Sequence, residues 1–206
     1  MSVLCWNAQG MGNPWTVQHL RSLVKDFSPT IIFLMETRVC DSEVRGLKLL
    51  FQQYNMLVVS SVGREGGLLL LWKKDCNLTV QSYSQNHIDF VVKESSNAIW
   101  RGTGIYGWPK QQDKHRTWTL SRSLKTDQIQ AWLCFGDFNE VLYTYEKIGR
   151  RGNNISEMTS FLDACNFCNL EDMSACGVKY TWSNGRRGEA NVKKIFDRFL
   201  ANPDWL

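Results

Sequence analysis

The chain has 206 residues, of which 43% are hydrophobic and 21% charged, and a formal net charge of +4. These proportions are ordinary for a soluble globular protein, and the length suits one domain with a substantial core, so we expect a single domain over residues 1–206. No uninterrupted apolar stretch is longer than five residues, as in LLLLW at 68–72, which is far too short to cross a bilayer and excludes a membrane-spanning segment. The mild positive charge permits a polyanionic partner without requiring one.

The N-terminus lacks a basic segment followed by an apolar run, so no signal peptide is predicted. We expect an intracellular monomer of the nucleus or cytoplasm. The seven cysteines are odd in number and several lie in apolar runs, which indicates reduced, mostly buried thiols. Cys165, Cys168 and Cys176 suggest zinc ligands, but no fourth ligand lies nearby and the first two are one helical turn apart, which favours core packing.

Apolar runs separated by Gly, Asn, Asp and Ser recur along the chain and predict strands. They lie at 2–6, 30–35, 56–61, 67–72, 77–83, 88–93, 99–105, 131–135 and 179–183. Five of them fall between residues 56 and 105 without a convincing helix. That succession argues against a parallel, doubly wound sheet, which needs strands and helices in alternation.

Four segments instead repeat apolar residues at the spacing of one helical face. They lie at 13–27, 41–54, 114–124 and 155–167. Asp41 or Ser42 can cap the second helix, and Ser156 the fourth. Many short strands with a few long helices predict an α+β fold, in which two sheets pack together and the helices lie outside them.

Polar side chains end or interrupt apolar runs at six places in the sequence. They are Asn7, Glu36, Tyr106, Asp137 with Asn139, Thr181 with Asn184, and Asp197. Any one of them could be an ordinary loop residue that follows a strand. Strand ends on one edge of a sandwich converge in space, however, so the six together predict a single polar pocket on a rigid floor.

The residue types at these positions suit phosphate chemistry. Glu36 and Asp137 offer hard oxygen donors, and Mg²⁺ takes one or two carboxylates while water and phosphate oxygens fill its other positions. Asparagine amides and a tyrosine phenol can donate hydrogen bonds to a phosphate without adding charge. No Cys/His or Ser-His-Asp nucleophile set is visible, which fits direct attack by water. Metal-assisted hydrolysis of a phosphate ester is the coherent reaction class.

The segment RRGEANVKK at 186–194 carries Arg186, Arg187, Lys193 and Lys194 against Glu189 alone. Taken by itself, it is best interpreted as a solvated loop. The sharper interpretation is a contact with a nucleic-acid phosphate backbone.

Seven motifs in this order resemble the exonuclease–endonuclease–phosphatase superfamily, and most closely the endonuclease domain of LINE-type (non-LTR) retrotransposons common in plant genomes. The motifs are WNAQGMG (6–12), METR (35–38), GGLLLLW (66–72), YGWP (106–109), GDFNEVL (136–142), YTWSN (180–184) and FDRFLANPDWL (196–206). The resemblance implies a four-layer α/β sandwich, in which two mostly antiparallel sheets are flanked by helices and the pocket lies at one end of both sheets. It also implies DNA as the partner and nicking of DNA as the activity.

The resemblance further implies a role for each matching residue. Glu36 would hold Mg²⁺, for which Mn²⁺ could substitute, and Asn7 would help to position metal and phosphate. Tyr106 would contact the scissile phosphate. Asp137 would orient or activate the water, and Asn139 would bind the phosphate. The positions implied or expected to contact or support the substrate are Thr181, Asn184, Asp197, Arg186 and Arg187.

One departure from the family pattern is a missing Ser-Asp-His motif, which the resemblance places on a last strand. The sequence ends at Leu206 before such a motif, and none of His19, His87 and His115 stands in that context. General acid–base catalysis typically contributes ~10²–10⁴-fold, so this loss alone could abolish detectable activity. We therefore expect a domain truncated at its C-terminus, without its last strand. The alternatives to a nicking endonuclease are a catalytically inactive remnant and a phosphatase of the same superfamily that acts on a small phosphoester.

Overall fold

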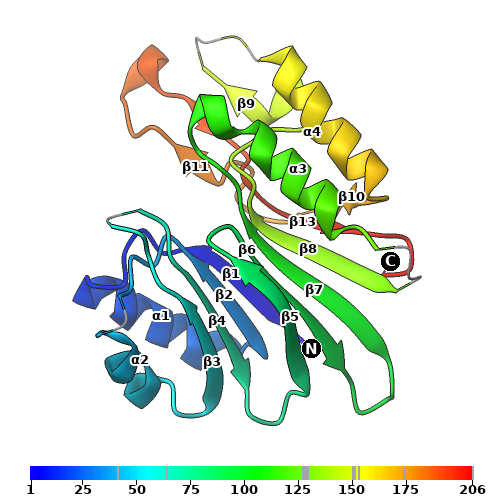
Figure 1. Cartoon of the computed structure of the whole chain (residues 1–206). Coiled ribbons are helices and arrows are strands. Elements are labelled where there is room, and N and C mark those ends of the chain that lie inside the picture. The colour runs from blue at the N-terminus through cyan, green and yellow to red at the C-terminus, as the bar shows by residue number, and fades with distance from the viewer. Residues whose placement is uncertain are drawn as a thin grey trace. The chain divides into compact units, whose positions relative to one another are not determined.

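The structure is a computed structural model that describes residues 1–40, 42–63, 65–126, 130–149, 152, 154–173 and 175–205. The chain divides into two compact units, Met1–Gly104 and Ile105–Leu206 (Figure 1). The boundary falls inside strand β7 (Ile99–Tyr106), whose last two residues belong to the second unit. The prediction of one domain over 1–206 stays a prediction.

The first unit contains a four-stranded sheet with the strand order β1-β2-β4-β3. The strands are β1 (Val3–Asn7), β2 (Ile31–Met35), β3 (Tyr54–Val59) and β4 (Leu68–Lys73). β1 and β2 are parallel, whereas β4 is antiparallel to both of its neighbours. All five residues of β2 are buried, which explains why its sequence is a continuous apolar run.

Two helices cover one face of this sheet, α1 (Pro14–Phe27) and α2 (Val44–Leu50) (Figure 1). Their apolar faces share a core with alternate residues of β2 and β4: Leu20, Val24, Leu47, Ile32, Leu34, Leu69 and Leu71. α1 begins as the sequence indicates, because Asn13 accepts a hydrogen bond from Trp15 N (3.0 Å) and Pro14 occupies the first turn.

The predicted start of the second helix is wrong. α2 begins three residues later than expected, and its N-cap is Glu43, which forms no side-chain cap. Ser42 precedes the cap in a turn, while Asp41 lies outside the described residues. The helix also ends at Leu50 rather than at 54, because Tyr54 already begins β3.

The other face of the four-stranded sheet packs within the same unit against β5 (Leu78–Ser84), β6 (His87–Lys93) and the first part of β7, which lie in the order β7-β6-β5. A Cβ on Gly104 would lie 2.6 Å from the ring of Phe33, and a Cβ on Gly102 would lie 2.4 Å from the ring of Phe90. Glycines in β7 therefore make room for aromatic rings of β2 and β6.

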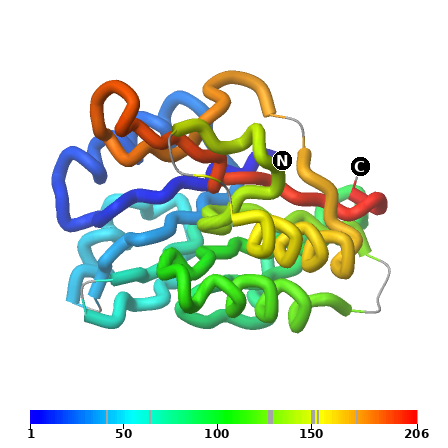
Figure 2. Tube along the Cα trace, turned by 90° about the horizontal axis from the view of Figure 1, so that it is seen from above, coloured from blue at the N-terminus to red at the C-terminus, as the bar shows by residue number. Residues whose placement is uncertain are grey.

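The second unit contains strands in the order β10-β13-β8-β7, with β8 (Ala131–Asp137), β10 (Glu171–Asp172) and β13 (Asp197–Ala201). Helices α3 (His115–Leu124) and α4 (Ile155–Phe167) lie side by side in both views and share one core with these strands (Figures 1 and 2). A small sheet has the order β11-β12-β9, from β9 (Lys147–Ile148), β11 (Trp182–Ser183) and β12 (Lys193–Lys194).

The α+β prediction, with mostly antiparallel sheets flanked by helices, is confirmed. The strand predicted over 179–183 is confined to Trp182 and Ser183. The fourth helix occupies the predicted range, but its N-cap is Asn154, and Ser156 lies inside the helix. No helix in the described part of the chain is long and apolar enough to cross a membrane.

All seven cysteines are free thiols, as expected, but four of them are not buried, so the prediction of mostly buried thiols is wrong. Cys40 and Cys176 are exposed. Cys165 and Cys168 pack in the core of the second unit, which confirms core packing over a zinc site for this pair. Burial raises the pKa of the Cys165 thiol to about 12.

Candidate active site

Asn7 and Glu36, the two predicted metal-binding residues, lie together in the first unit. Asn7 ends β1 and is paired in register with Met35, the last residue of β2, so Glu36 follows directly beside it. Asn7 Nδ2 donates a hydrogen bond to Glu36 Oε1 (3.0 Å), and both side chains are half-buried. This bond fixes the carboxylate relative to the strand ends.

The backbone around Glu36 is strained. Glu36 has a φ of 50° and Arg38 a φ of 52°, a region that non-glycine residues rarely adopt. The turn is held by hydrogen bonds from Thr37 N to Gly67 O (3.1 Å) and from Arg38 N to Gly66 O (3.0 Å). Such strain costs about 1–3 kcal/mol per residue and is found most often at functional sites, which supports a functional role for this strand end.

The donor set in the first unit fits Mg²⁺ better than zinc. It consists of one carboxylate, Glu36, and one side-chain amide, Asn7, both of which are hard oxygen ligands. Within the described ranges, no group of three or more His, Cys, Asp and Glu residues could hold a metal ion. Mg²⁺ retains several waters and commonly takes only one or two carboxylates from the protein, so a sparse set of this kind suits it.

In the second unit, Asp137 is buried at the end of β8, with 5% of its surface exposed. Its Oδ1 accepts a hydrogen bond from Asn139 N (2.8 Å). Asn139 Nδ2 in turn donates to the carbonyl of Gly107 (2.9 Å), which follows the buried Tyr106 at the end of β7. The structure therefore brings three predicted residues, Tyr106, Asp137 and Asn139, into one connected corner.

The backbone at this corner is not extended. Asn139 has a φ of 54°, so the alternation of an extended strand does not decide where the Asp137 and Asn139 side chains point. An aspartate that accepts the N–H two residues ahead forms an Asx-turn, and asparagine tolerates the left-handed conformation that follows. The turn itself positions the two side chains.

Gly136 lies inside β8 and lets the neighbouring strand β7 approach closely. β8 continues through it to Asp137, so it does not turn the chain at the end of a strand. Its φ is +143°, and a Cβ there would lie 1.9 Å from the carbonyl oxygen of Ile105. The glycine is required because the backbone of β7 approaches β8 too closely for any side chain.

Asp197 lies directly opposite Asp137. β13 runs antiparallel to β8, and the register pairs Asp197 with Asp137 and Phe199 with Phe135. Residues paired in this way share one face of a sheet, and the two phenylalanine rings stack on it with centroids 5.5 Å apart. Two carboxylates opposite each other repel, a cost more typical of functional than of purely structural positions.

Thr181 immediately precedes β11, and its side chain contacts the start of β13. Its Oγ1 accepts hydrogen bonds from Phe196 N (3.0 Å) and Asp197 N (3.1 Å), although the residue is exposed. The side chain therefore fixes the backbone that presents Asp197.

Asn184, Arg186 and Arg187 lie on the connection between β11 and β12. Asn184 organises the connection, since its Oδ1 accepts from Arg186 N (3.2 Å) and Val192 N (3.1 Å) and its Nδ2 donates to Ala190 O (2.9 Å). Arg186 and Arg187 are exposed. Asn184 thus shapes the segment that carries the two arginines.

Sequence reasoning missed an aromatic and basic surface in the second unit. Tyr143 and Tyr145 are exposed and stack with an interplanar angle of 8°, and Lys179 Nζ lies 5.6 Å from the Tyr145 ring centroid. Lys194 Nζ lies 5.8 Å from the ring of Trp182. The only sequence signal was the proximity of tyrosines to GDFN, because Lys179 comes from a distant segment.

Sequence reasoning also missed the buried charges behind the Asp137 corner. Arg198, on the opposite face of β13 from Asp197, donates to Glu146 Oε2 (2.9 Å) and Asp172 Oδ2 (2.8 Å). Lys114 Nζ lies 3.0 Å from Glu140 Oε2 and 3.8 Å from Glu157 Oε2. These contacts anchor the segment that follows Asp137.

Burial shifts the pKa values of two side chains near these contacts, Glu157 and Lys194. It raises the pKa of Glu157, with a further rise from Glu140, whereas Lys114 acts in the opposite direction. Burial also lowers the pKa of Lys194, and the nearby Lys114 and Lys147 lower it further. The cationic side chains here are thus partly desolvated.

Each of the three histidines has distinct surroundings. The His19 ring packs edge-on to Trp6 with centroids 5.4 Å apart. His87 is buried on β6, and its ring nitrogens form hydrogen bonds with Ser82 and Ser84. His115 is exposed at the start of α3.

The predicted residues thus form two sets, one in each unit. Asn7 and Glu36 lie together in the first unit, and Tyr106, Asp137, Asn139, Thr181 and Asp197 are connected by the contacts above in the second. The convergence of both sets on a single pocket stays a prediction.

Comparison with solved structures identifies proteins of the same fold. AP endonuclease LMAP from Leishmania major superposes with a TM-score of 0.73 at 14% identity, covering 98% of this chain and 79% of that one. The endonuclease domain of TRAS1, a telomere-specific non-LTR retrotransposon, gives 0.69 at 11% identity, with 98% and 85% covered. The 3′-5′ exonuclease NExo from Neisseria meningitidis gives 0.72 at 15% identity, with 98% and 87% covered.

At these identities the likeness establishes the fold. No protein-family model matches the sequence, and a search of curated proteins gave no match. The three neighbours named above are an AP endonuclease, a retrotransposon endonuclease domain and a 3′-5′ exonuclease.

Proposed function

We propose that this chain hydrolyses phosphodiester bonds in DNA with Mg²⁺, as the nicking endonuclease domain of a LINE-type retroelement of the kind common in plant genomes. The observation that carries the proposal is the Asp137 corner. A buried carboxylate at a strand end is held by Asn139 N and lies opposite a second carboxylate, Asp197. A buried carboxylate in such a position is suited to act on a water molecule.

The fold neighbours support this reaction class. They include an AP endonuclease, a retrotransposon endonuclease domain and a 3′-5′ exonuclease. One neighbour is a 3′ phosphatase bound to a product DNA hairpin, and another is complexed with single-strand DNA product. The shared fold is thus used repeatedly by proteins that act on DNA.

In the proposed mechanism, Asp137 orients the attacking water and takes its proton as the water oxygen bonds to phosphorus. The bond from phosphorus to one sugar oxygen of the DNA strand breaks, and that oxygen leaves and is protonated from solvent. Asn139 has two amide hydrogens, one of which is donated to Gly107 O, and the other is donated to a phosphate oxygen. The phenolic hydroxyl of Tyr106 donates a hydrogen bond to the phosphate. Asp197, which lies opposite Asp137, places a second carboxylate beside it in this proposal.

Glu36 and Asn7 hold the metal in this proposal. The hydrogen bond between them keeps the Glu36 carboxylate in a single orientation. Mg²⁺, or Mn²⁺ in its place, would supply charge neutralisation at the phosphate oxygens as the bond breaks. We expect the chain to act as a monomer in the nucleus or cytoplasm.

The segment between β11 and β12 is proposed to contact the DNA backbone. Arg186 and Arg187 are exposed and would bind phosphates, while Asn184 fixes the segment that carries them. Phosphate contacts position a protein on DNA without reading sequence, so this segment contributes affinity rather than target choice.

A second candidate is DNA binding without turnover. It is favoured by the surroundings of the histidines, since His87 is buried between two serines and His19 packs on Trp6. The resemblance assigns a histidine to the phosphate or the water, and neither of these two has surroundings suited to that role.

A plasmid assay distinguishes these candidates. Supercoiled plasmid is incubated with the purified chain and Mg²⁺, with EDTA and Glu36→Ala as controls. Nicking that requires metal and is lost in the variant is expected. A folded chain that retards plasmid in a gel without nicking it supports binding without turnover, and hydrolysis of p-nitrophenyl phosphate alone supports a phosphatase.

A further inference from the structure

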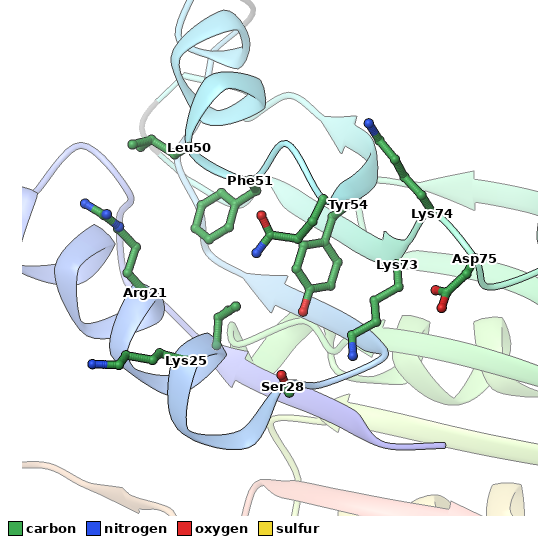
Figure 3. Close-up of a pocket in the computed structure, with 11 residues that line it drawn as sticks. Arg21, Lys25, Ser28, Leu50, Phe51, Tyr54, Lys73, Lys74 and Asp75 are labelled. Carbon is green, nitrogen blue, oxygen red and sulfur yellow. The ribbon is translucent and has the colours of Figure 1, made fainter.

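The first unit contains a concave site, formed where α1 and α2 end beside β3 and β4 (Figure 3). Its cavity volume is about 800 Å³, within the roughly 300–1,000 Å³ of ordinary small-molecule sites. The residues that line it and bear on its chemistry are Arg21, Lys25, Lys73, Lys74, Asp75 and the floor residues Val24, Phe51 and Tyr54.

The floor of this basic pocket is apolar and fixed. Phe51 is 2% exposed, Tyr54 6% and Val24 8%, and all three belong to the core of the first unit. The Tyr54 hydroxyl donates to the carbonyl of Pro29 (2.7 Å), which holds its ring in place. Burial raises the pKa of Tyr54, so the phenol stays protonated at neutral pH.

Four cationic side chains surround this floor. Arg21 and Lys25 come from α1, and Lys73 and Lys74 come from the end of β4 on the other side (Figure 3). Asp75 is the single acidic residue of the lining. In the part of the chain that the structure describes, none of the four cations forms an ion pair.

Two of the four cations form an unfavourable pair on α1. Arg21 and Lys25 are four residues apart on one helix, a spacing at which like charges destabilise. Lys25 alone could be explained by its place in the last turn of α1, where a cation complements the helix dipole. That explanation does not extend to Arg21, Lys73 and Lys74, and a bound anion would offset the positive charge that the four side chains bring to the pocket.

The basic pocket is separate from Glu36. Lys73 N donates to Thr30 O (3.0 Å), just before β2 begins, whereas Glu36 follows its end. The two sites therefore lie at opposite ends of a five-residue strand, which spans roughly 16 Å at about 3.3 Å per residue. A ligand here would not need the catalytic residues.

We propose that the basic pocket binds a phosphate-bearing ligand of nucleotide size, with its phosphates among the four cations and its base against the apolar floor. Two kinds of molecule present these groups, a free nucleotide and the phosphorylated end of a nucleic-acid strand. The residues that line the pocket all belong to the first unit. The proposal therefore does not depend on whether the chain cleaves DNA.

Calorimetric titration with three probes tests the site at about 0.15 M salt: ADP, a 5′-phosphorylated single-stranded oligonucleotide and inorganic phosphate. The variants are Arg21→Gln/Lys25→Gln and Lys73→Gln/Lys74→Gln. The matched control is Arg45→Gln/Lys48→Gln, which removes one arginine and one lysine from exposed positions of α2 outside the pocket. Glu36→Gln removes the proposed metal ligand, which does not line the pocket. This variant should bind the three probes as tightly as the parent does, so probe binding and the proposed catalytic function are tested separately.

Saturable binding of ADP or the oligonucleotide is expected, weakened at least about tenfold in each pocket variant because charge-assisted contacts are lost. The control should change less, because Arg45 and Lys48 are exposed and do not line the pocket. Asp75→Asn should strengthen binding. The proposal is overturned if neither nucleotide probe binds, if phosphate binds as tightly as ADP, or if the control loses as much affinity as the pocket variants.

Discussion

His87 is a buried histidine held between two hydroxyl groups. Its Nδ1 lies 2.7 Å from Ser84 Oγ and its Nε2 lies 3.1 Å from Ser82 Oγ. Burial lowers the pKa of His87; Asp89 acts to raise it and Arg101 to lower it further, with a net downward shift. The folded protein therefore favours the neutral imidazole.

This shift predicts acid destabilisation. Below the ordinary histidine pKa of about 6.5, the unfolded chain takes up a proton that folded His87 resists. The free energy of unfolding therefore decreases as the pH is lowered, by at most about 1.4 kcal/mol per pH unit. The loss should begin between pH 7 and 6 and continue down to the lowered pKa of the folded state. Urea unfolding of the parent and of His87→Gln measures it. Equal acid destabilisation in both proteins would contradict the assignment, and His115→Gln controls for the chemistry of the substitution.

Gly136 offers a second test at a single position. A Cβ there would lie 1.9 Å from Ile105 O at a φ of +143°, so Gly136→Ala should cost at least about 2 kcal/mol. The matched change is Gly46→Ala inside α2, where nothing lies within 4 Å; it should stabilise by up to about 1 kcal/mol. Thermal and urea unfolding of both variants would refute this explanation if their effects had the same sign.

The residue types at the candidate site could be predicted from sequence, but their conformations could not. Asp137 and Asn139 are visible as a carboxylate and an amide after an apolar run. The partner of the Asn139 side chain, the carbonyl of Gly107, is 32 residues away. Contacts of that range leave no local pattern in the sequence.

At the scale of elements, β13 is held in place by a buried cation. Both terminal nitrogens of Arg198 bond to Glu146, at 3.2 and 2.9 Å, and the side chains of the pair are 1% and 3% exposed. Arg198 also donates to the backbone carbonyl of Ile195 (3.1 Å) and to Asp172. The strand that presents Asp197 is thereby joined to the segment that follows β8.

Removal of this cation should be costly. Arg198→Met leaves Glu146 buried without its guanidinium, which typically costs about 3–5 kcal/mol. The double variant Arg198→Met/Glu146→Gln should recover part of that loss, because no buried charge is left unpaired. Arg116→Met breaks only the exposed pair with Asp113 (3.7 Å) and should cost less than about 1 kcal/mol. Similar losses for Arg198→Met and Arg116→Met in urea unfolding would show that the buried pair is not a structural anchor.

Elements with a local signal were predicted well, and those without one were missed. The buried run of β2 and the amphipathic face of α1 each carry their own periodicity. β13 was missed because its sequence, DRFLA, mixes two charged residues into an apolar run. The buried Arg198 is stabilised there by Glu146, 52 residues away, and by Asp172.

At the scale of the whole molecule, the account assigns one reaction to residues from both units. Glu36 and Asn7 belong to the first unit, and Tyr106, Asp137 and Asn139 to the second. If both sets serve the same chemical step, the loss of either should stop it, and the loss of both should cost little more than the loss of one. The basic pocket makes no such demand, since it lies in the first unit alone.

The most direct test is the rate of Mg²⁺-dependent plasmid nicking by the parent, Glu36→Gln, Asp137→Asn and the double variant, with Asp163→Asn as the control on an exposed position of α4. The account predicts nicking by the parent and by Asp163→Asn. It predicts a loss of at least about 10²-fold in each single site variant, with little further loss in the double. Absence of nicking by the folded parent, or full activity of Asp137→Asn, would contradict it.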